Sequence, residues 1–211
     1  MTNSRGKSDP LSQTTKTYLK DVYIEEAYGR RYEFTSKYTD KGKFAEQDSL
    51  KLVTENRDKF YSKNRERFEN QYVSGNPDII DGDTVIDIKT CWNMKTFISK
   101  DIIKKDYMWQ LQGYMWLTDL KKAELIYTLV NTPPHLIVSE KTKQMYANGL
   151  EDGSPEMAEM EARIDKWMTF DDVDPKLRMR VFELERDEKL IDQIKIRVED
   201  ARVFLNNISL N

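Results

Sequence analysis

The sequence GNPDIIDGDTVIDIK, residues 75–89, predicts two short β-strands joined by a tight turn. The turn is signalled by Asp-Gly-Asp at 81–83, which stands between two apolar runs. Side chains alternate along a strand, so Asp87 and Lys89 share one face of the second strand. The turn brings Asp78, on the first strand, back toward them. We therefore expect two carboxylates and an ammonium group to converge on one point, as in a divalent-cation site with a basic group beside it.

A solvent-exposed hairpin would also carry charges at these three positions, so the neighbouring residues help to decide between the two interpretations. Asp87 stands within the apolar run at 85–88, where an uncompensated carboxylate would be costly. Pro77 ends the upstream extended segment and fixes the direction in which Asp78 projects. Both observations favour a metal site over a solvated hairpin.

The composition is that of a polar globular protein, with 211 residues, 38% of them apolar and 34% charged. This length gives one domain, expected at 11–211, with a flexible tail at 1–10 and a C-terminal helical extension at about 185–208. The sequence shows neither an apolar signal segment nor a run long enough to span a bilayer, so we expect a cytoplasmic protein without a membrane partner. The net charge of −3 neither indicates nor excludes a nucleic-acid partner.

The scarcity of cysteine and histidine narrows the metal chemistry. Cys91 is the single cysteine, which excludes an internal disulfide and a cysteine-ligated iron–sulfur cluster. His135 is the single histidine, which leaves no His-rich zinc site and no convincing Ser-His-Asp triad. Any metal must therefore be held by oxygen atoms, which favours Mg²⁺ or Mn²⁺.

Apolar spacing gives a coarse secondary structure on both sides of the hairpin. Helices are expected at 11–28, at about 40–60, at 102–118, in pieces over 135–170 and at 185–206. Strands are expected at about 71–75 leading into 78–80, at 84–89, at 122–130 and at 178–183. This order predicts an α/β domain with a mixed central β-sheet flanked by helices.

Three further residues stand where such a site would use them. Glu46, on the helix before the hairpin, would supply a third carboxylate. Gln110 and Tyr114 are four residues apart and share one face of the following helix, from which they would orient Lys89 or a phosphate group. Taken singly, each is also an ordinary position on an amphipathic helix, so the prediction of a site depends on their occurring together.

The combination resembles the RecB-like branch of the PD-(D/E)XK nuclease superfamily, in particular its viral-recombinase exonucleases of the YqaJ and lambda-exonuclease type. The family's motifs match Glu46 on a helix, Pro-Asp at 77–78, acidic-x-Lys at 87–89 and Gln-x-x-x-Tyr at 110–114. They occur in the family's order over about 40–130. The flanking segments also look like those of phage-encoded members, and the lack of four cysteines implies the type without an iron–sulfur cluster.

The resemblance implies a restriction-endonuclease-like core and a Mg²⁺-dependent DNA exonuclease, with Mn²⁺ as a substitute metal. Such an enzyme would act at DNA ends in phage-type recombination or DNA processing. Lys89 would position the attacking water and stabilise the developing negative charge. The metal would be held by Glu46, Asp78, Asp87 and the Ile88 carbonyl, with Gln110 and Tyr114 as orienting groups.

Two other functions stay open on the same fold. One is a structure-specific or nicking endonuclease, because the motif sets the chemistry and not the topology of the substrate. The other is an inactive nucleic-acid-binding or virion-associated protein. Every motif residue is present, which favours an active enzyme.

The expected substrate is double-stranded DNA with free ends. Basic and aromatic residues around the motifs suit contacts to phosphates and bases, although a solvated loop would carry the same residues. A single-strand annealing protein and a homo-oligomer are further partners left open, and a phage-encoded chain would act in the host-cell cytoplasm. The candidate DNA-binding residues are Arg30, Arg31, Trp92, Lys95, Lys100, Lys104 and Lys105.

Overall fold

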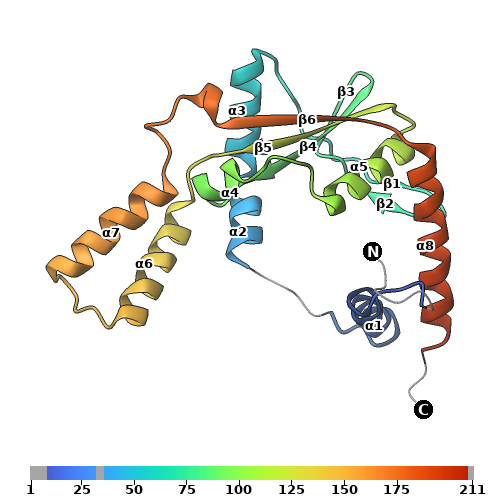
Figure 1. Cartoon of the computed structure of the whole chain (residues 1–211), viewed down its shortest axis with the longest axis horizontal. Helices are drawn as coiled ribbons and strands as arrows, with labels where there is room; N and C mark the ends of the chain where they lie inside the picture. The colour runs from blue at the N-terminus through green and yellow to red at the C-terminus, as the bar shows by residue number, and fades with distance from the viewer. Residues whose placement is uncertain (1–8, 32–35, 209–211) are drawn as a thin grey trace.

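The computed structural model describes residues 9–31 and 36–208. Most of the expected N-terminal tail, residues 1–8, lies outside the described residues. At the centre is a four-stranded sheet in the order β3-β4-β5-β6, formed by β3 (Ile79–Asp81), β4 (Thr84–Thr90), β5 (Lys122–Thr128) and β6 (Met179–Glu185) (Figure 1). β4 and β5 run parallel, while the two outer pairings are antiparallel. The expected mixed sheet flanked by helices is confirmed.

β3 and β4 form the hairpin that the sequence predicts. Ile79 pairs with Ile86 and Asp81 pairs with Thr84, which leaves a two-residue loop. The first loop residue, Gly82, has φ +59°, a conformation that an L side chain disfavours. The turn chemistry therefore sets the register that places the charged residues of β4.

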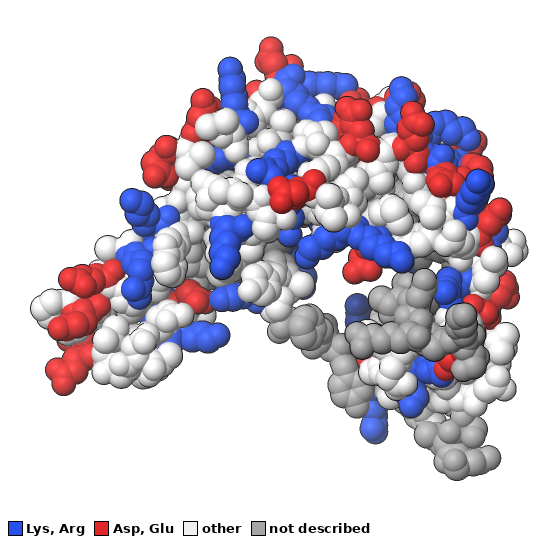
Figure 2. Space-filling model, in the orientation of Figure 1, with Lys and Arg blue, Asp and Glu red and all other residues white. Residues whose placement is uncertain are grey.

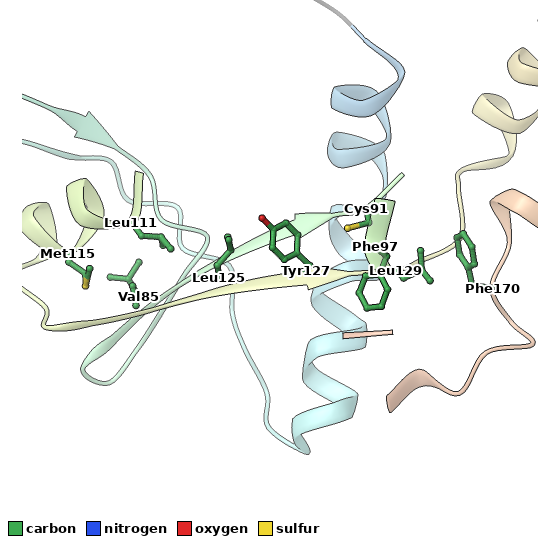
Figure 3. Packing of buried hydrophobic residues seen from close by; sticks show 10 residues of the cluster. Val85, Cys91, Phe97, Leu111, Met115, Leu125, Tyr127, Leu129 and Phe170 are labelled. Carbon is green, nitrogen blue, oxygen red and sulfur yellow. The ribbon is translucent and has the colours of Figure 1, made fainter. Parts of the chain in front are cut away.

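Helices cover both faces of the sheet. On one face, α5 (Lys105–Thr118) packs on β4 and β5, and Figure 3 shows this core with Val85, Leu111, Met115, Leu125 and Tyr127. On the other face, α3 (Glu46–Arg57) packs through Val53 against Ile79, Ile86 and Ile126. The strands alternate between these two cores, so both faces of β4 and β5 are buried.

Some expected elements have different bounds in the structure. The single helix expected at about 40–60 is wrong, because α2 (Lys37–Phe44) and α3 are separated at Ala45, whose φ of −100° and ψ of 12° interrupt the helix. The strand expected at 71–75 belongs to a separate hairpin of β1 (Phe68–Glu69) and β2 (Ser74–Gly75). A short helix, α4 (Met94–Ile98), was not expected, and the helix expected from 102 begins at 105.

The two terminal helices pack together beside this core. α1 (Gln13–Tyr28) contacts α8 (Glu188–Asn206) through Leu19 and Ala201, and α8 also packs on α5 (Figure 1). None of the helices in the described part of the chain combines the length and the apolarity that crossing a bilayer requires.

A helical hairpin projects from the connection between β5 and β6 (Figure 1). It consists of α6 (Pro134–Asn148) and α7 (Pro155–Met168), followed by the 3₁₀ turn η1 (Pro175–Leu177). Its root is closed by hydrogen bonds from Thr132 N to Met168 O (2.8 Å) and from Leu129 N to Arg178 O (2.9 Å). Met160 and Ile164 give the hairpin a small core of its own.

Lys41 of α2 is fully buried and ties this helix to the end of β4. Its ammonium group donates a hydrogen bond to the carbonyl oxygen of Trp92 at 2.9 Å and lies 5.2 Å from the ring centre of Phe170. Burial lowers the pKa of Lys41 to about 7, while the nearby Cys91 opposes this shift. Burial also raises the pKa of Cys91 to about 11.

We predict that stability rises between pH 7 and 9 because of Lys41. In this range the unfolded chain holds a proton on Lys41 that the folded protein has released, so the free energy of unfolding increases by up to about 1.4 kcal/mol per pH unit. Above pH 9 Cys91 acts in the opposite direction, because the folded protein retains a proton that the unfolded chain loses. Urea denaturation of wild type and Lys41→Met across this range measures the effect, and equal slopes would contradict it.

Candidate active site

A cleft of about 540 Å³ opens between α2, α3 and the hairpin of β3 and β4. It brings together three of the residues that the motifs predict, Glu46, Asp78 and Lys89, with the predicted backbone ligand Ile88. We call this cavity the catalytic cleft. The residues that line it are Tyr38, Thr39, Gly42, Lys43, Glu46, Gln47, Leu50, Lys63, Asp78, Ile79, Ile88, Lys89, Thr90 and Tyr107.

Asp87 is buried beneath the cleft and forms an ion pair with Lys89, which lines it. Their side chains lie on the same face of β4, and Lys89 Nζ is 2.5 Å from Asp87 Oδ2. Asp87 is 1% exposed, so burial raises its pKa to about 6, and the charge of Asp78 adds to this effect while Lys89 opposes it. Burial alone would lower the pKa of Lys89, but the two carboxylates outweigh it and raise that pKa. The strand alternation inferred from sequence is therefore confirmed.

Asp78 is held against the backbone of β4. Its Oδ2 accepts a hydrogen bond from the Ile88 N–H at 2.8 Å. Burial raises the pKa of Asp78, and the negative charge of Glu46 raises it further, while the hydrogen bond from Ile88 and the charge of Lys89 lower it. Asp78 thus stands between the other two carboxylates, because the charge of Glu46 acts on Asp78 and the charge of Asp78 acts on Asp87.

A buried hydroxyl network positions Glu46. Ser49, one turn further along α3, lies 2.8 Å from the Thr90 hydroxyl and accepts a hydrogen bond from the Thr128 hydroxyl at 2.9 Å. These contacts fix the first turn of α3 at the ends of β4 and β5. Glu46 then projects into the catalytic cleft, where its Oε1 is 2.6 Å from Lys63 Nζ.

Gln110 and Tyr114 are paired with each other on α5. The Gln110 amide donates to the Tyr114 hydroxyl at 2.8 Å. Burial raises the pKa of Tyr114, and the charges of Asp87 and Asp78 add to this shift, while the hydrogen bond with Gln110 and the charge of Lys89 oppose it. Neither Gln110 nor Tyr114 is among the described residues that line the catalytic cleft.

Several residues at the site were not singled out from sequence. Tyr107 packs beneath Lys89, whose ammonium group lies 5.3 Å from the ring centre. Lys43 and Lys63 add positive charge to the cleft. The helical spacing places Tyr107 on the same helix as Gln110 and Tyr114, but its contact with Lys89 depends on how α5 packs over β4.

None of the seven candidate DNA-binding residues is among the described residues that line the catalytic cleft. Trp92 contacts Tyr38 of the cleft edge to face, with ring centres 5.6 Å apart. Lys100 packs over the ring of Tyr127, while Arg30, Arg31, Lys95, Lys104 and Lys105 are exposed. Figure 2 shows Lys and Arg interspersed with Asp and Glu on the face drawn, and not gathered into a single basic surface.

The donor set suits an oxygen-ligated divalent cation, although the described residues contain no preformed group of three or more His, Cys, Asp or Glu that could hold a metal ion. Asp87 Oδ2 is buried, and its contact with Lys89 lacks the angles of a hydrogen bond. Burial and a neighbouring negative charge raise the pKa values of Asp78 and Asp87, so an added cation would stabilise the ionised form of both carboxylates. The residues therefore fit Mg²⁺ or Mn²⁺, with Asp78 and Asp87 as the central donors.

Comparison with solved structures identifies this fold. The chain is a structural match to phage-related and alkaline exonucleases of the lambda-exonuclease-like PD-(D/E)XK type, so the resemblance seen in the motifs is confirmed. A phage-related exonuclease from Haemophilus somnus 129PT matches with a TM-score of 0.75 and 26% identity, over 97% of this chain and 88% of that one.

An alkaline exonuclease from Laribacter hongkongensis matches with a TM-score of 0.61 and 16% identity, over 92% of this chain and 81% of that one. The same enzyme in complex with dAMP matches with a TM-score of 0.59 and 17% identity, over 90% and 79% of the two chains. At the level of sequence, no family model and no curated protein matches this chain.

We predict that Gly75→Ala disturbs the Gln110–Tyr114 pair. A Cβ atom at Gly75 would lie 2.5 Å from Cε1 of the half-buried Tyr114 ring, which must then move. We expect the free energy of unfolding to fall by about 1–3 kcal/mol. Gly113→Ala is the control, because its Cβ meets no atom within 4 Å, and it should raise stability by about 0.5–1 kcal/mol. Thermal denaturation of both variants measures the difference, and stabilisation by Gly75→Ala would contradict the prediction.

Proposed function

We propose that this protein is a metal-dependent deoxyribonuclease that removes nucleotides from DNA ends. The observation that carries the proposal is the convergence of Glu46, Asp78 and the Asp87–Lys89 pair at one end of β4. The fold shared with phage-related and alkaline exonucleases supports it, as does the crystallisation of one of these enzymes with dAMP.

The residues of the chain have separate tasks in phosphodiester hydrolysis. Asp78 and Asp87, with Glu46 and the Ile88 carbonyl, would hold Mg²⁺ or Mn²⁺. When bound, the metal supplies acidification of a coordinated water and neutralisation of charge on the phosphate oxygens. Lys89 is kept protonated by the two carboxylates, so its ammonium group can donate a hydrogen bond to the attacking water or to the phosphate.

Other parts of the site position these groups. Tyr107 holds Lys89 from below, and the Ser49 network holds the first turn of α3. Lys43 and Lys63 at the cleft wall would attract the phosphate backbone of the strand that is cut. The basic residues outside the cleft, including Lys95 and Lys105, would extend this attraction along the DNA.

We predict that Asp87→Asn and Lys89→Met each lower the rate of cleavage of linear double-stranded DNA by at least about a hundredfold, because Asp87 would hold the metal and Lys89 would stabilise the charge that develops on the phosphate. Asp83→Asn is the matched control on the same hairpin, where Asp83 pairs with Lys122 at the surface (2.9 Å). Release of nucleotides in Mg²⁺ measures the rate, with thermal denaturation to verify folding. Wild-type rates in either site variant would overturn the assignment.

The same assay distinguishes exonuclease from endonuclease. An enzyme that acts at ends degrades linear DNA and leaves covalently closed circular DNA intact. Nicking of the closed circle would instead support the structure-specific or nicking endonuclease, and no cleavage of any form by folded wild type would support a binding protein.

We predict that the activity depends on a divalent cation. Excess EDTA should abolish cleavage, and Mg²⁺ or Mn²⁺ should restore it. A cation that binds the folded site also raises the melting temperature of wild type, by mass action, and this shift should be lost in Asp87→Asn. Full activity in excess EDTA, or an equal shift in both proteins, would contradict an oxygen-ligated metal site.

A further inference from the structure

A second cavity lies beside the catalytic cleft, with a volume of about 430 Å³. Its walls come from the loop and strand at 73–74, from α5 and from α8, so residues far apart in the sequence enclose it. We call it the side pocket. Its lining residues are Val73, Ser74, Asp106, Trp109, Gln110, Gly113, Tyr114, Leu117, Gln193, Ile194, Arg197 and Val198.

The lining of the side pocket suits a flat, uncharged heterocycle. Trp109 and Tyr114 provide aromatic surface, and aliphatic side chains from α5 and α8 complete the apolar part. Gln110 and Gln193 offer amide donors and acceptors for the edge of such a ring. The lining contains one aspartate and one arginine, whereas a phosphate site would show an excess of cations.

A glycine keeps one wall of the side pocket open. Gly113 lies within α5, where glycine is less stable than alanine. A Cβ atom at this position would meet nothing within 4 Å, so no packing contact requires the glycine. Its effect is to leave space between Trp109 and Leu117, one turn away on either side along the helix.

The side pocket and the catalytic cleft are both lined by α5: Asp106 lines the side pocket, and the next residue, Tyr107, lines the catalytic cleft. Gln110 and Tyr114 line the side pocket and are hydrogen bonded to each other at 2.8 Å. Tyr114 also interacts with the charges of Asp87, Lys89 and Asp78. A DNA strand whose phosphate lay in the catalytic cleft, against Tyr107, would therefore pass close to the side pocket, which begins at Asp106 on the same helix.

We propose that the side pocket binds a nucleobase of the DNA strand whose backbone enters the catalytic cleft, with Trp109 as the stacking surface. This proposal rests on the proposed nuclease function, because the cleft must hold a phosphodiester. Stacking on an aromatic side chain accepts every base, so the pocket would position the strand without reading its sequence.

The test compares intact DNA with DNA that lacks one base. Labelled oligonucleotides carry a single abasic residue at successive positions from one end, and fluorescence anisotropy measures their Kd. The proteins carry Lys89→Met so that the DNA is not degraded. We expect the abasic residue to weaken binding by about tenfold to a hundredfold at one or two positions near the end, because one stacked base is lost.

Two variants should remove this difference. Trp109→Ala deletes the stacking surface, and Gly113→Leu fills the open wall, so both should bind intact and abasic DNA equally. Trp116→Ala is the matched control on the same helix, because Trp116 contacts Tyr72 (ring centres 5.7 Å apart) and lies outside the pocket lining. It should keep the full difference.

The outcomes separate this proposal from the proposed function. If the protein with Trp109 and Gly113 intact binds intact and abasic DNA equally at every position, the proposal of a base-binding pocket is overturned. The side pocket would then suit an apolar side chain of a protein partner. Retention of the difference in Trp109→Ala would also overturn it. If wild type binds DNA with this base dependence but cleaves none, the nuclease proposal fails and the base-binding pocket stands.

Discussion

The burial of the Asp87 carboxylate within the central sheet is the constraint on which the site depends. An ionised carboxylate that is 1% exposed is unfavourable without a partner. β4 supplies the partner two residues later, because Lys89 lies on the same face. Tyr107 of α5 packs against Lys89, whose ammonium group lies 5.3 Å from the ring centre. This contact joins the charged pair of β4 to the helix that covers the same face of the sheet.

The opposite face of the sheet contributes through a polar contact. Ser49 bridges the hydroxyls of Thr90 and Thr128 at the ends of β4 and β5, where an apolar contact would leave them unpaired. This bridge brings Glu46 to the same end of β4 that Lys89 occupies. The site therefore forms where the two layers of helices meet at one edge of the sheet, and each layer supplies part of it.

Much of this arrangement can be predicted from the local sequence pattern, whereas the rest depends on packing between distant segments. The Asp-Gly turn and the alternation of β4 predicted that Asp87 and Lys89 share a face, because both depend on neighbours in the chain. The break at Ala45 could not be predicted, because a helix-favouring residue gives no signal of interruption. The pairing of Lys63 with Glu46 and the side pocket between α5 and α8 depend on contacts between distant segments.

The α6–α7 hairpin has a consequence for how the chain tolerates change. It leaves from the end of β5 and returns to the start of β6, which are antiparallel neighbours, so its two ends lie together. Thr132 and Met168 close this root by a backbone hydrogen bond. A longer, shorter or entirely different excursion from this point would leave the sheet register unchanged and add little loop-closure entropy. It would, however, remove the contacts that α6 makes with α2, which are the Lys37–Glu140 ion pair and the ring contact between Phe44 and His135. The hairpin is thus separable from the pairing of the strands, but it is coupled to the helix that lines the catalytic cleft.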